Sequence, residues 1–280
     1  MWSNYHTHTS YCDGTHDPAE IIPYTTGLAS VGFSSHAPLP FECKWCIKRD
    51  ELTRYLGVIE TLKPAVTAPE VYTGLEIDFI PGLITPAQFT GKTDYTIGSV
   101  HFVDAYTHGQ PWEVDGSHAV FLEGLEQIFH NNIEDAIQRY FELVRQMVDT
   151  ACPTIVGHLD KIKIQNVENR FFSETDTWYR KAVIRTLDCI AARGAIVEVN
   201  TRGLYQGKSS TPYPSPWVLE LILQKNIPIT ISSDAHHPRD LTNHFEETAS
   251  LLYHTGFRKL SILLGGEWQQ HKFNARGFVF

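Results

Sequence analysis

Short strand-like apolar runs alternate with amphipathic segments along the whole chain, and no tandem repeat, polar linker or long charge run interrupts them. Each apolar run is short enough to be a parallel strand that is buried on both faces. This alternation is typical of proteins built from repeated strand and helix units. The 280 residues fit one large α/β barrel or two ordinary domains, and the unbroken pattern favours a single domain over residues 1–280.

Local signals predict where the helices and strands lie. A capping box with proline at the first helical position begins a helix at Asp17, and Pro23 is expected to kink or shorten it. Ser215-Pro216 begins a second helix. The spacing of apolar residues predicts three more helices, over residues 52–62, 133–148 and 183–190. After two early strands that end near residues 6 and 35, further strands are predicted over residues 71–77, 95–100, 154–157, 195–199, 227–231 and 260–264.

The composition is that of a globular protein, with 42% hydrophobic and 20% charged residues. The net charge of −9 argues against broad capture of nucleic acid or of an anionic membrane surface, because both depend on basic patches. A small molecule is therefore the expected partner. The sequence does not indicate an oligomeric state.

Cysteine content and the first residues bear on localisation. Five cysteines cannot all pair within the chain, so reduced thiols are expected. Cys43 and Cys46 form a CxxC motif, but no second pair or nearby histidine completes a zinc site, and we interpret the motif as structural. Residues 1–6 lack a basic segment, and no run of about 20 apolar residues follows, so the sequence predicts a soluble, cytoplasmic protein.

Potential metal ligands stand at the C-terminal ends of nearly all the predicted strands. They are His6, His8, His36, Glu76, His101, His158, Asp234 and His236. Side chains two residues apart on a strand point to the same face, so His6 and His8 can reach one ion together. In a barrel of parallel strands, all these ends meet at one rim. One histidine alone would be an ordinary core residue, whereas this set is too large for one ion and predicts two or three ions bridged by a carboxylate such as Glu76.

These residues resemble the motifs of the polymerase-and-histidinol-phosphatase (PHP) superfamily. The resemblance is carried by His6-Thr7-His8-Thr9, Cys12-Asp13-Gly14, His36, Glu76, Gly98-Ser99-Val100-His101-Phe102, Gly157-His158 and Ser233-Asp234-Ala235-His236, which span almost the whole chain. Within the superfamily, the histidinol-phosphatase branch is the most similar. That finer resemblance is carried by the compact length, Ser99-Val100-His101-Phe102, Gly157-His158-Leu159-Asp160 and Glu198-Val199-Asn200-Thr201-Arg202-Gly203-Leu204.

The resemblance implies a distorted (β/α)7 TIM-like barrel with a metal cluster at the C-terminal rim of its strands. The cluster would hold two or three divalent ions of zinc, manganese or iron. One ion would take His6, His8, Glu76 and Asp234, a second Glu76, His101 and His158, and a third Asp13, His36 and His236. Family members vary between His and Asp at the position of Asp13, and His16 is the alternative ligand or a substrate contact.

The implied reaction is hydrolysis of L-histidinol phosphate to L-histidinol and phosphate, a step of histidine biosynthesis, through attack by a metal-bridging hydroxide. Arg202 follows a strand end and is the first choice to hold the phosphate, because a guanidinium binds two phosphate oxygens at once. Lys208, Arg239 and Lys161 are weaker choices. His16 and Asp160 are the candidates to protonate the leaving oxygen, and Asp160 could instead orient a ligand histidine.

Other functions remain open from the sequence. A PHP-type phosphoesterase could act on another small phosphate ester or on a nucleotide with the same cluster. A metal-dependent amidohydrolase also begins with two histidines after its first strand, but its two-metal site would leave Asp13, His36 and His236 unused. A polymerase-associated nuclease is disfavoured by the charge of −9. A non-catalytic scaffold is disfavoured because no ligand position carries an inert residue.

Overall fold

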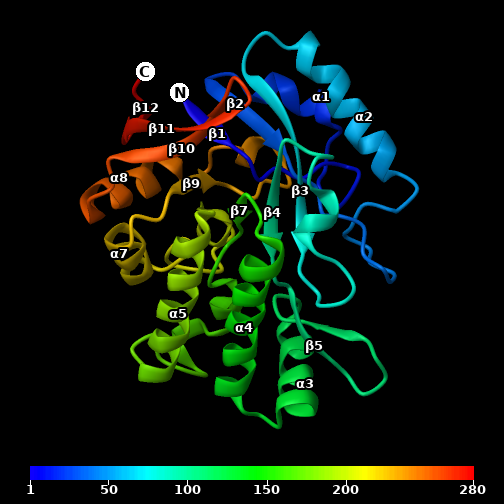
Figure 1. Cartoon of the computed structure of the whole chain (residues 1–280), viewed down its shortest axis with the longest axis vertical. Helices are drawn as coiled ribbons and strands as arrows, with labels where there is room; N and C mark the ends of the chain where they lie inside the picture. Colours follow the sequence, from blue (N-terminus) through cyan, green and yellow to red (C-terminus); the bar gives the residue numbers. More distant parts are fainter.

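Seven parallel strands form the centre of the computed structural model, which describes all residues from 1 to 280 (Figure 1). Their order in the sheet is β1-β2-β3-β4-β7-β8-β9. The strands are β1 (Trp2–Asn4), β2 (Leu28–Phe33), β3 (Glu70–Asp78), β4 (Tyr95–Ser99), β7 (Ile155–Val156), β8 (Ile196–Asn200) and β9 (Ile229–Ser232). Because every neighbouring pair is parallel, the C-terminal ends of all these strands lie at one rim.

The sheet curls until its first and last strands meet. Beyond the end of β1, Thr7 forms an isolated parallel bridge with Ala235, which follows β9. The His8 N–H donates to the Ala235 carbonyl over 2.8 Å, and the Ala235 N–H donates to the His6 carbonyl over 3.0 Å. These backbone hydrogen bonds close the barrel at its C-terminal rim. The predicted α/β barrel, distorted and built on parallel strands, is confirmed.

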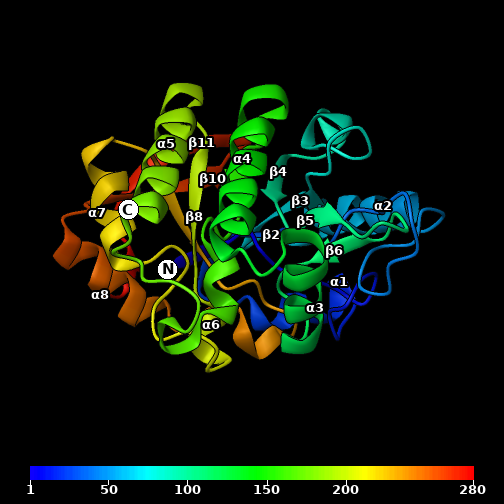
Figure 2. The ribbon, with the colours of Figure 1, turned by 90° about the horizontal axis from the view of Figure 1, so that it is seen from below.

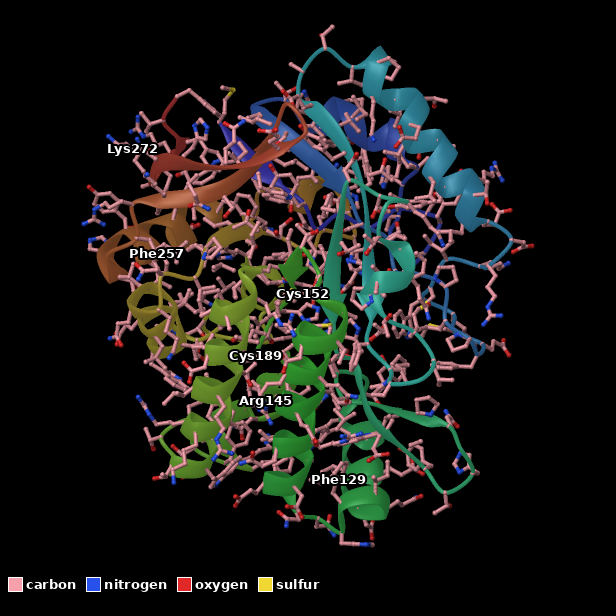
Figure 3. The ribbon with its side chains drawn as sticks, in the orientation of Figure 1. Phe129, Arg145, Cys152, Cys189, Phe257 and Lys272 are labelled. Atoms are coloured by element: carbon pink, nitrogen blue, oxygen red, sulfur yellow. The ribbon has the colours of Figure 1, made fainter.

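Helices cover the outside of the barrel. They are α1 (Pro18–Ile21), α2 (Leu52–Leu62), α3 (His118–Phe129), α4 (Ile133–Ala151), α5 (Thr177–Arg193), α6 (Arg202–Tyr205), α7 (Pro216–Gln224) and α8 (Phe245–Thr255). The long helices α4 and α5 pack side by side (Figure 2), and Arg145 of α4 donates a 3.1 Å hydrogen bond to Thr186 of α5 close to Cys189 (Figure 3). No helix combines the length and the apolar character that crossing a membrane would require.

The predicted strand over residues 260–264 exists, but it lies outside the parallel sheet. It is β10 (Lys259–Leu264), and it pairs antiparallel with β11 (Glu267–Asn274), which in turn pairs with β12 (Gly277–Phe278). The reason is the connection after β10. Gly265 and Gly266 both adopt positive φ angles, 58° and 80°, as a two-residue hairpin turn requires, so the chain returns directly along β10. The strand is buried, as expected, but the expectation that it is parallel was wrong.

Two elements that the sequence pattern did not predict follow β4. Strands β5 (Phe102–Ala105) and β6 (Pro111–Glu113) form a hairpin, and α3 packs against it. Trp112 of β6 is fully buried, and its Nε1–H donates to the carbonyl of Val120 in α3 over 3.1 Å. The hairpin thereby holds Glu113 and Asp115 beside the C-terminal rim.

Tyr95 of β4 packs tightly against Gly74 of the adjacent strand β3 and against Gly32 of β2, the next strand of the sheet. Its hydroxyl donates to the carbonyl of Tyr5 over 2.5 Å. A Cβ built on Gly32 would lie 2.2 Å from the Tyr95 hydroxyl oxygen, and one on Gly74 would lie 2.3 Å from the ring carbon Cζ. Positions 32 and 74 therefore accept only glycine without a shift of the Tyr95 ring.

We expect Gly74→Ala to destabilise the protein by about 1–3 kcal/mol, because the added methyl group overpacks a closed site. Gly57→Ala is the matched control, since Gly57 is exposed within α2 and a Cβ there meets nothing within 4 Å. Removing a glycine from a helix interior should stabilise the protein by about 0.5–1 kcal/mol. Urea unfolding of the two variants measures both effects, and equal unfolding midpoints would contradict the packing argument.

Candidate metal centre and active site

The potential ligands converge at the rim because each follows or ends a different strand of the barrel. His6 and His8 follow β1, and Glu76 lies near the C-terminal end of β3. His36, after β2, forms a parallel bridge with Glu76 that extends the sheet past its regular end. The remaining ligands follow β4, β7 and β9, and they are His101, His158, Asp234 and His236.

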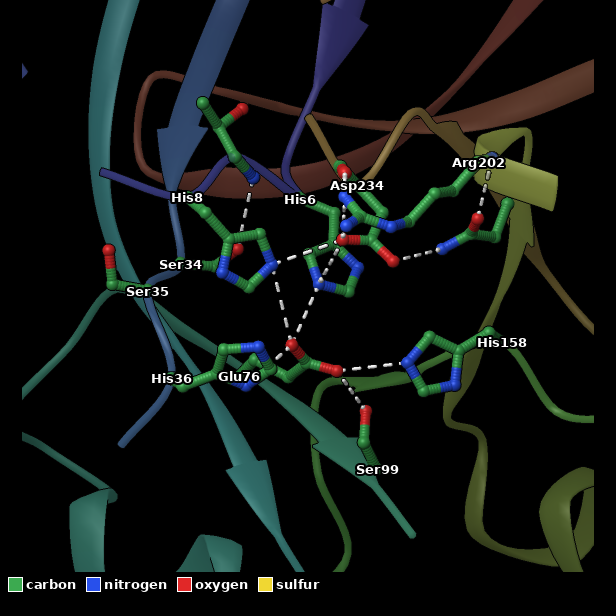
Figure 4. A network of polar contacts seen from close by, with 12 residues as sticks. His6, His8, Ser34, Ser35, His36, Glu76, Ser99, His158, Arg202 and Asp234 are labelled. Atoms are coloured by element: carbon green, nitrogen blue, oxygen red, sulfur yellow. Dashed lines mark hydrogen bonds and ion pairs between the residues drawn. The ribbon is translucent and has the colours of Figure 1, made fainter. Parts of the chain in front are cut away.

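Glu76 occupies the centre of this group and is almost fully buried (Figure 4). Its Oε2 lies 3.1 Å from His6 Nε2, 3.5 Å from His8 Nε2 and 3.1 Å from His36 Nδ1. Its Oε1 lies 2.9 Å from His158 Nε2 and 3.6 Å from His101 Nε2. The two oxygens of one carboxylate thus face two separate sets of histidines, which is the arrangement that a bridging ligand needs.

Four overlapping groups of side chains bring their ligand atoms within 4.8 Å of one another. They are His8, Asp13, His36 and His236; His6, His8 and Asp234; His36, Asp78 and His101; and Glu76, His101 and His158. The second predicted set, Glu76, His101 and His158, is one of these groups. The group that contains the third predicted set also includes His8, which was expected only in the first set. Its Nε2 lies 3.1 Å from Asp234 Oδ1 while its Nδ1 lies 3.6 Å from Asp13 Oδ1.

Unpartnered buried nitrogens show that these residues fit divalent ions. His6 Nε2, His8 Nε2 and His36 Nδ1 have no hydrogen-bond partner although each is shielded from solvent. A buried polar atom left without a partner is costly, and native proteins rarely tolerate several of them side by side. All three point at the carboxylate oxygens of Glu76 or Asp234, so a cation between them would satisfy both nitrogens and oxygens.

The charges of the cluster are strongly coupled. Burial alone would raise the pKa of Glu76, but the adjacent His36 and His6 hold that pKa well below its usual range. Burial would likewise raise the pKa of Asp234, and His6 and Arg202 lower it. Burial lowers the pKa of His36 to about 4 despite the neighbouring acids. The site therefore presents ionised carboxylates beside a neutral His36, the forms in which both bind metal. Burial would also lower the pKa values of His6 and His101, but neighbouring acids, Glu198 for His6 and Asp78 for His101, raise both.

Two buried acids that sequence reasoning missed orient the ligand histidines. Glu198 accepts from His6 Nδ1 over 2.6 Å with one oxygen and from the His158 backbone N–H over 2.8 Å with the other. Asp78 lies 2.9 Å from His101 Nδ1. Each fixes which ring nitrogen of its histidine is free for an ion. The signal was available, because Asp78 stands two residues after Glu76 and shares its strand face.

Replacing Glu198 by glutamine should weaken metal binding about 10- to 30-fold, because the amide keeps the size but loses the charge that fixes His6. Metal affinity is measured by competition with a chromogenic chelator. The control is Glu267→Gln, an exposed glutamate of β11. Equal affinities in the two variants would show that Glu198 does not support the cluster.

A cavity of about 180 Å³ opens over the cluster and carries both signs of charge. Arg202, Lys161 and Lys208 supply positive charge, whereas Glu113 and Asp115 supply negative charge. Lys161 Nζ lies 2.8 Å from Asp115 Oδ2 and 3.3 Å from His101 Nε2. The cavity can therefore hold a ligand that carries charges of both signs.

The loop after β9, which carries Asp234 and His236, holds Arg202 at the cavity wall. Its guanidinium donates to the Asp234 carbonyl over 2.7 Å and to His236 Nδ1, and it lies 3.5 Å from Asp234 Oδ1. Burial alone would lower the pKa of Arg202, but Asp234 and Tyr205 raise it, so the group stays charged.

Three residues that the sequence suggested lie elsewhere. Asp160 is buried against Lys163 at 3.0 Å and accepts from the Ser215 N–H over 2.9 Å, and it contacts no ligand histidine. His16 bonds to Thr15 over 2.8 Å, with its ring 5.1 Å from that of His237, outside the cavity. Arg239 is exposed and also outside the cavity.

These placements correct the sequence expectations. Neither Asp160 nor His16 is positioned to protonate a leaving group in the cavity, and Arg239 is not positioned to hold a phosphate there. Between the two alternative ligands, the geometry favours Asp13, whose Oδ2 lies 3.0 Å from His236 Nε2. Spacing along the chain placed these residues near the rim but could not show which way their side chains turn.

Curated relatives match this chain over nearly their full length. A probable histidinol-phosphatase of Deinococcus radiodurans is 26% identical over 270 residues, which cover 92% of this chain and 95% of the relative. The histidinol-phosphatase of Bacillus subtilis is 27% identical over 262 residues, covering 86% of this chain and 96% of the relative.

Solved structures show the same fold. The candidate histidinol phosphatase of Listeria monocytogenes superposes with a TM-score of 0.77 at 21% identity, covering 88% of this chain and 99% of the other. The histidinol phosphate phosphatase of Lactococcus lactis, solved with zinc, L-histidinol and phosphate, gives 0.70 at 20% identity, covering 96% and 98%. Residues 4–202 match the PHP domain, and the chain belongs to the PHP domain family.

Proposed function

We propose that this protein is a metal-dependent phosphomonoesterase that hydrolyses L-histidinol phosphate to L-histidinol and phosphate. One observation carries the proposal. Glu76 turns its two oxygens toward two separate sets of histidines at the floor of a cavity whose wall carries Arg202. A charge-dense floor with a guanidinium beside it is suited to a phosphate group.

The side chains around the cluster would have different roles in the reaction. Divalent ions held there would acidify water near neutral pH and neutralise phosphate charge. Arg202, with Lys161 and Lys208, would hold the phosphoryl oxygens in one orientation. Glu198 and Asp78 would keep His6 and His101 in the tautomer that binds metal.

The acidic and aromatic side chains of the cavity support the choice of substrate. Histidinol carries an ammonium group and an imidazole, which carboxylates and aromatic faces bind. Glu113, Asp115 and Trp45 line that same cavity. The Bacillus subtilis relative bears the name of this activity, and the Lactococcus lactis structure holds L-histidinol and phosphate.

The proposal includes two or three divalent ions and a single domain over residues 1–280. The four ligand groups overlap pairwise at His8, His36 and His101, which favours more than one ion, and zinc is present in the Lactococcus lactis structure. The single domain is supported by β9, which lies in the central sheet and is followed by Asp234 and His236.

The test is release of inorganic phosphate by zinc- or manganese-loaded protein from L-histidinol phosphate and from a panel of other phosphomonoesters, nucleotides included. We expect kcat/KM to favour L-histidinol phosphate at least ~100-fold, about 2.7 kcal/mol of transition-state discrimination. Equal, weak activity on all esters would overturn the assigned substrate. Absence of phosphate release from every ester would overturn the phosphatase and make amide hydrolysis the reaction to test.

A further inference from the structure

Cys43 and Cys46 lie on either side of a turn in the segment between His36 and α2. Lys44 and Trp45 form the turn itself. Cys43 is half-buried, so a small reagent can reach it, whereas Cys46 is only 6% exposed. A turn of this kind brings the residues at its two ends close enough for their side chains to touch.

The surroundings of the two thiols differ. Cys43 is the more exposed of the two, and its interaction with Cys46 lowers its pKa although burial opposes this. The interaction with Cys43, together with burial, raises the pKa of Cys46. Because the thiolate is the nucleophile and Cys43 is the more accessible thiol, Cys43 reacts first.

Trp45, between the two cysteines, is part of the active-site cavity. Its ring packs edge-on against the ligand His36 with centroids 4.5 Å apart, and it stacks on Phe102 at 5.8 Å. A change in the backbone of this turn therefore moves a side chain that supports a ligand histidine.

We propose that Cys43 and Cys46 form a reversible disulfide that reshapes the cavity through Trp45. The oxidant is a low-molecular-weight disulfide such as oxidised glutathione. The Cys43 thiolate attacks one sulfur of the oxidant, breaks its S–S bond and releases one thiolate. Cys46 then loses its proton to solvent and attacks the Cys43 sulfur, which forms the intrachain bond and releases the second thiol. Two electrons pass from the protein to the oxidant.

The bond requires the two sulfur atoms to approach to about 2.05 Å. The turn must tighten, and the Trp45 ring leaves its packed position against His36. We expect kcat/KM to fall about 10-fold, because small displacements beside a reacting centre are costly. This loss of activity rests on the proposed phosphatase function, whereas disulfide formation does not.

A rival pairing exists, because Cys12 and Cys46 line a second, shallow pocket. Trypsin separates the alternatives. The chain has no lysine or arginine before Lys44, so cleavage there yields a peptide of residues 1–44 with Cys12 and Cys43, and a peptide of residues 45–48 with Cys46. Linked peptides from Cys12→Ser protein after treatment with oxidised glutathione would show the Cys43–Cys46 bond, and dithiothreitol should separate them.

The functional arm compares the wild type with Cys43→Ser and with Cys152→Ser, which removes an exposed thiol far from this turn in sequence. Oxidised glutathione should lower kcat/KM and change the Trp45 fluorescence, identified by comparison with Trp45→Phe, in wild type and Cys152→Ser but not in Cys43→Ser. Absence of the linked peptides in Cys12→Ser, or their formation with unchanged fluorescence and kcat/KM, would overturn the proposal. Inactive reduced protein would instead refute the phosphatase and leave the peptide and fluorescence tests intact.

Discussion

Glu76→Gln should lower kcat by about a thousand-fold and reduce the metal content of the purified protein. The substitution removes the only charge that faces both sets of histidines, while the amide keeps the shape of the side chain. A thousand-fold loss in rate corresponds to about 4 kcal/mol of lost transition-state stabilisation.

The measurement combines phosphate release with metal analysis of the same preparation. Glu126→Gln, an exposed residue of α3, is the control for the chemical change itself. Full activity with normal metal content in Glu76→Gln protein would refute the bridging position. Low activity with normal metal content would instead place Glu76 in the reaction rather than in metal retention.

Arg202→Met should lower kcat/KM more than about 100-fold while leaving metal content unchanged, because the lost guanidinium holds phosphate by charge-assisted hydrogen bonds. Asp234 and His236 lose their contacts with the guanidinium, but Asp234 Oδ1 keeps its 3.1 Å contact with His8 Nε2, and His236 Nε2 keeps its 3.0 Å contact with Asp13 Oδ2. Methionine preserves the length of the side chain and its packing.

Arg239→Met provides the comparison, because Arg239 comes from the same end of the sheet but lies outside the cavity. We expect its kinetics to match the wild type. Loss of metal from Arg202→Met protein would mean that this arginine holds the ligand loop rather than the phosphate.

The position of the ligands along the chain could be predicted because a parallel barrel turns strand ends into neighbours. His6 and His8, like Asp234 and His236, are two residues apart and follow predicted strands, and the structure brings both pairs to the rim. The pattern alone sufficed because side-chain alternation and strand direction are backbone properties.

What sequence could not predict depends on side-chain direction and on contacts between distant segments. Asp160 follows His158 by two residues, yet its carboxylate turns to Lys163 and Ser215. Glu198 was noticed only as part of a family motif, although it contacts His6, 192 residues away. The Gly265-Gly266 turn is a readable hairpin signal, but the regular strand and helix alternation before it favoured another parallel strand.

The contact between the segments that follow β1 and β9 determines when the site can form during synthesis. The segments that close the barrel, residues 6–8 and 234–236, also carry four of the ligands. A nascent chain that ends before β9 lacks the closing strand, Asp234 of the first predicted metal set and His236 of the third. The reactive centre and the finished barrel therefore appear together, and a truncated translation product carries no competent site.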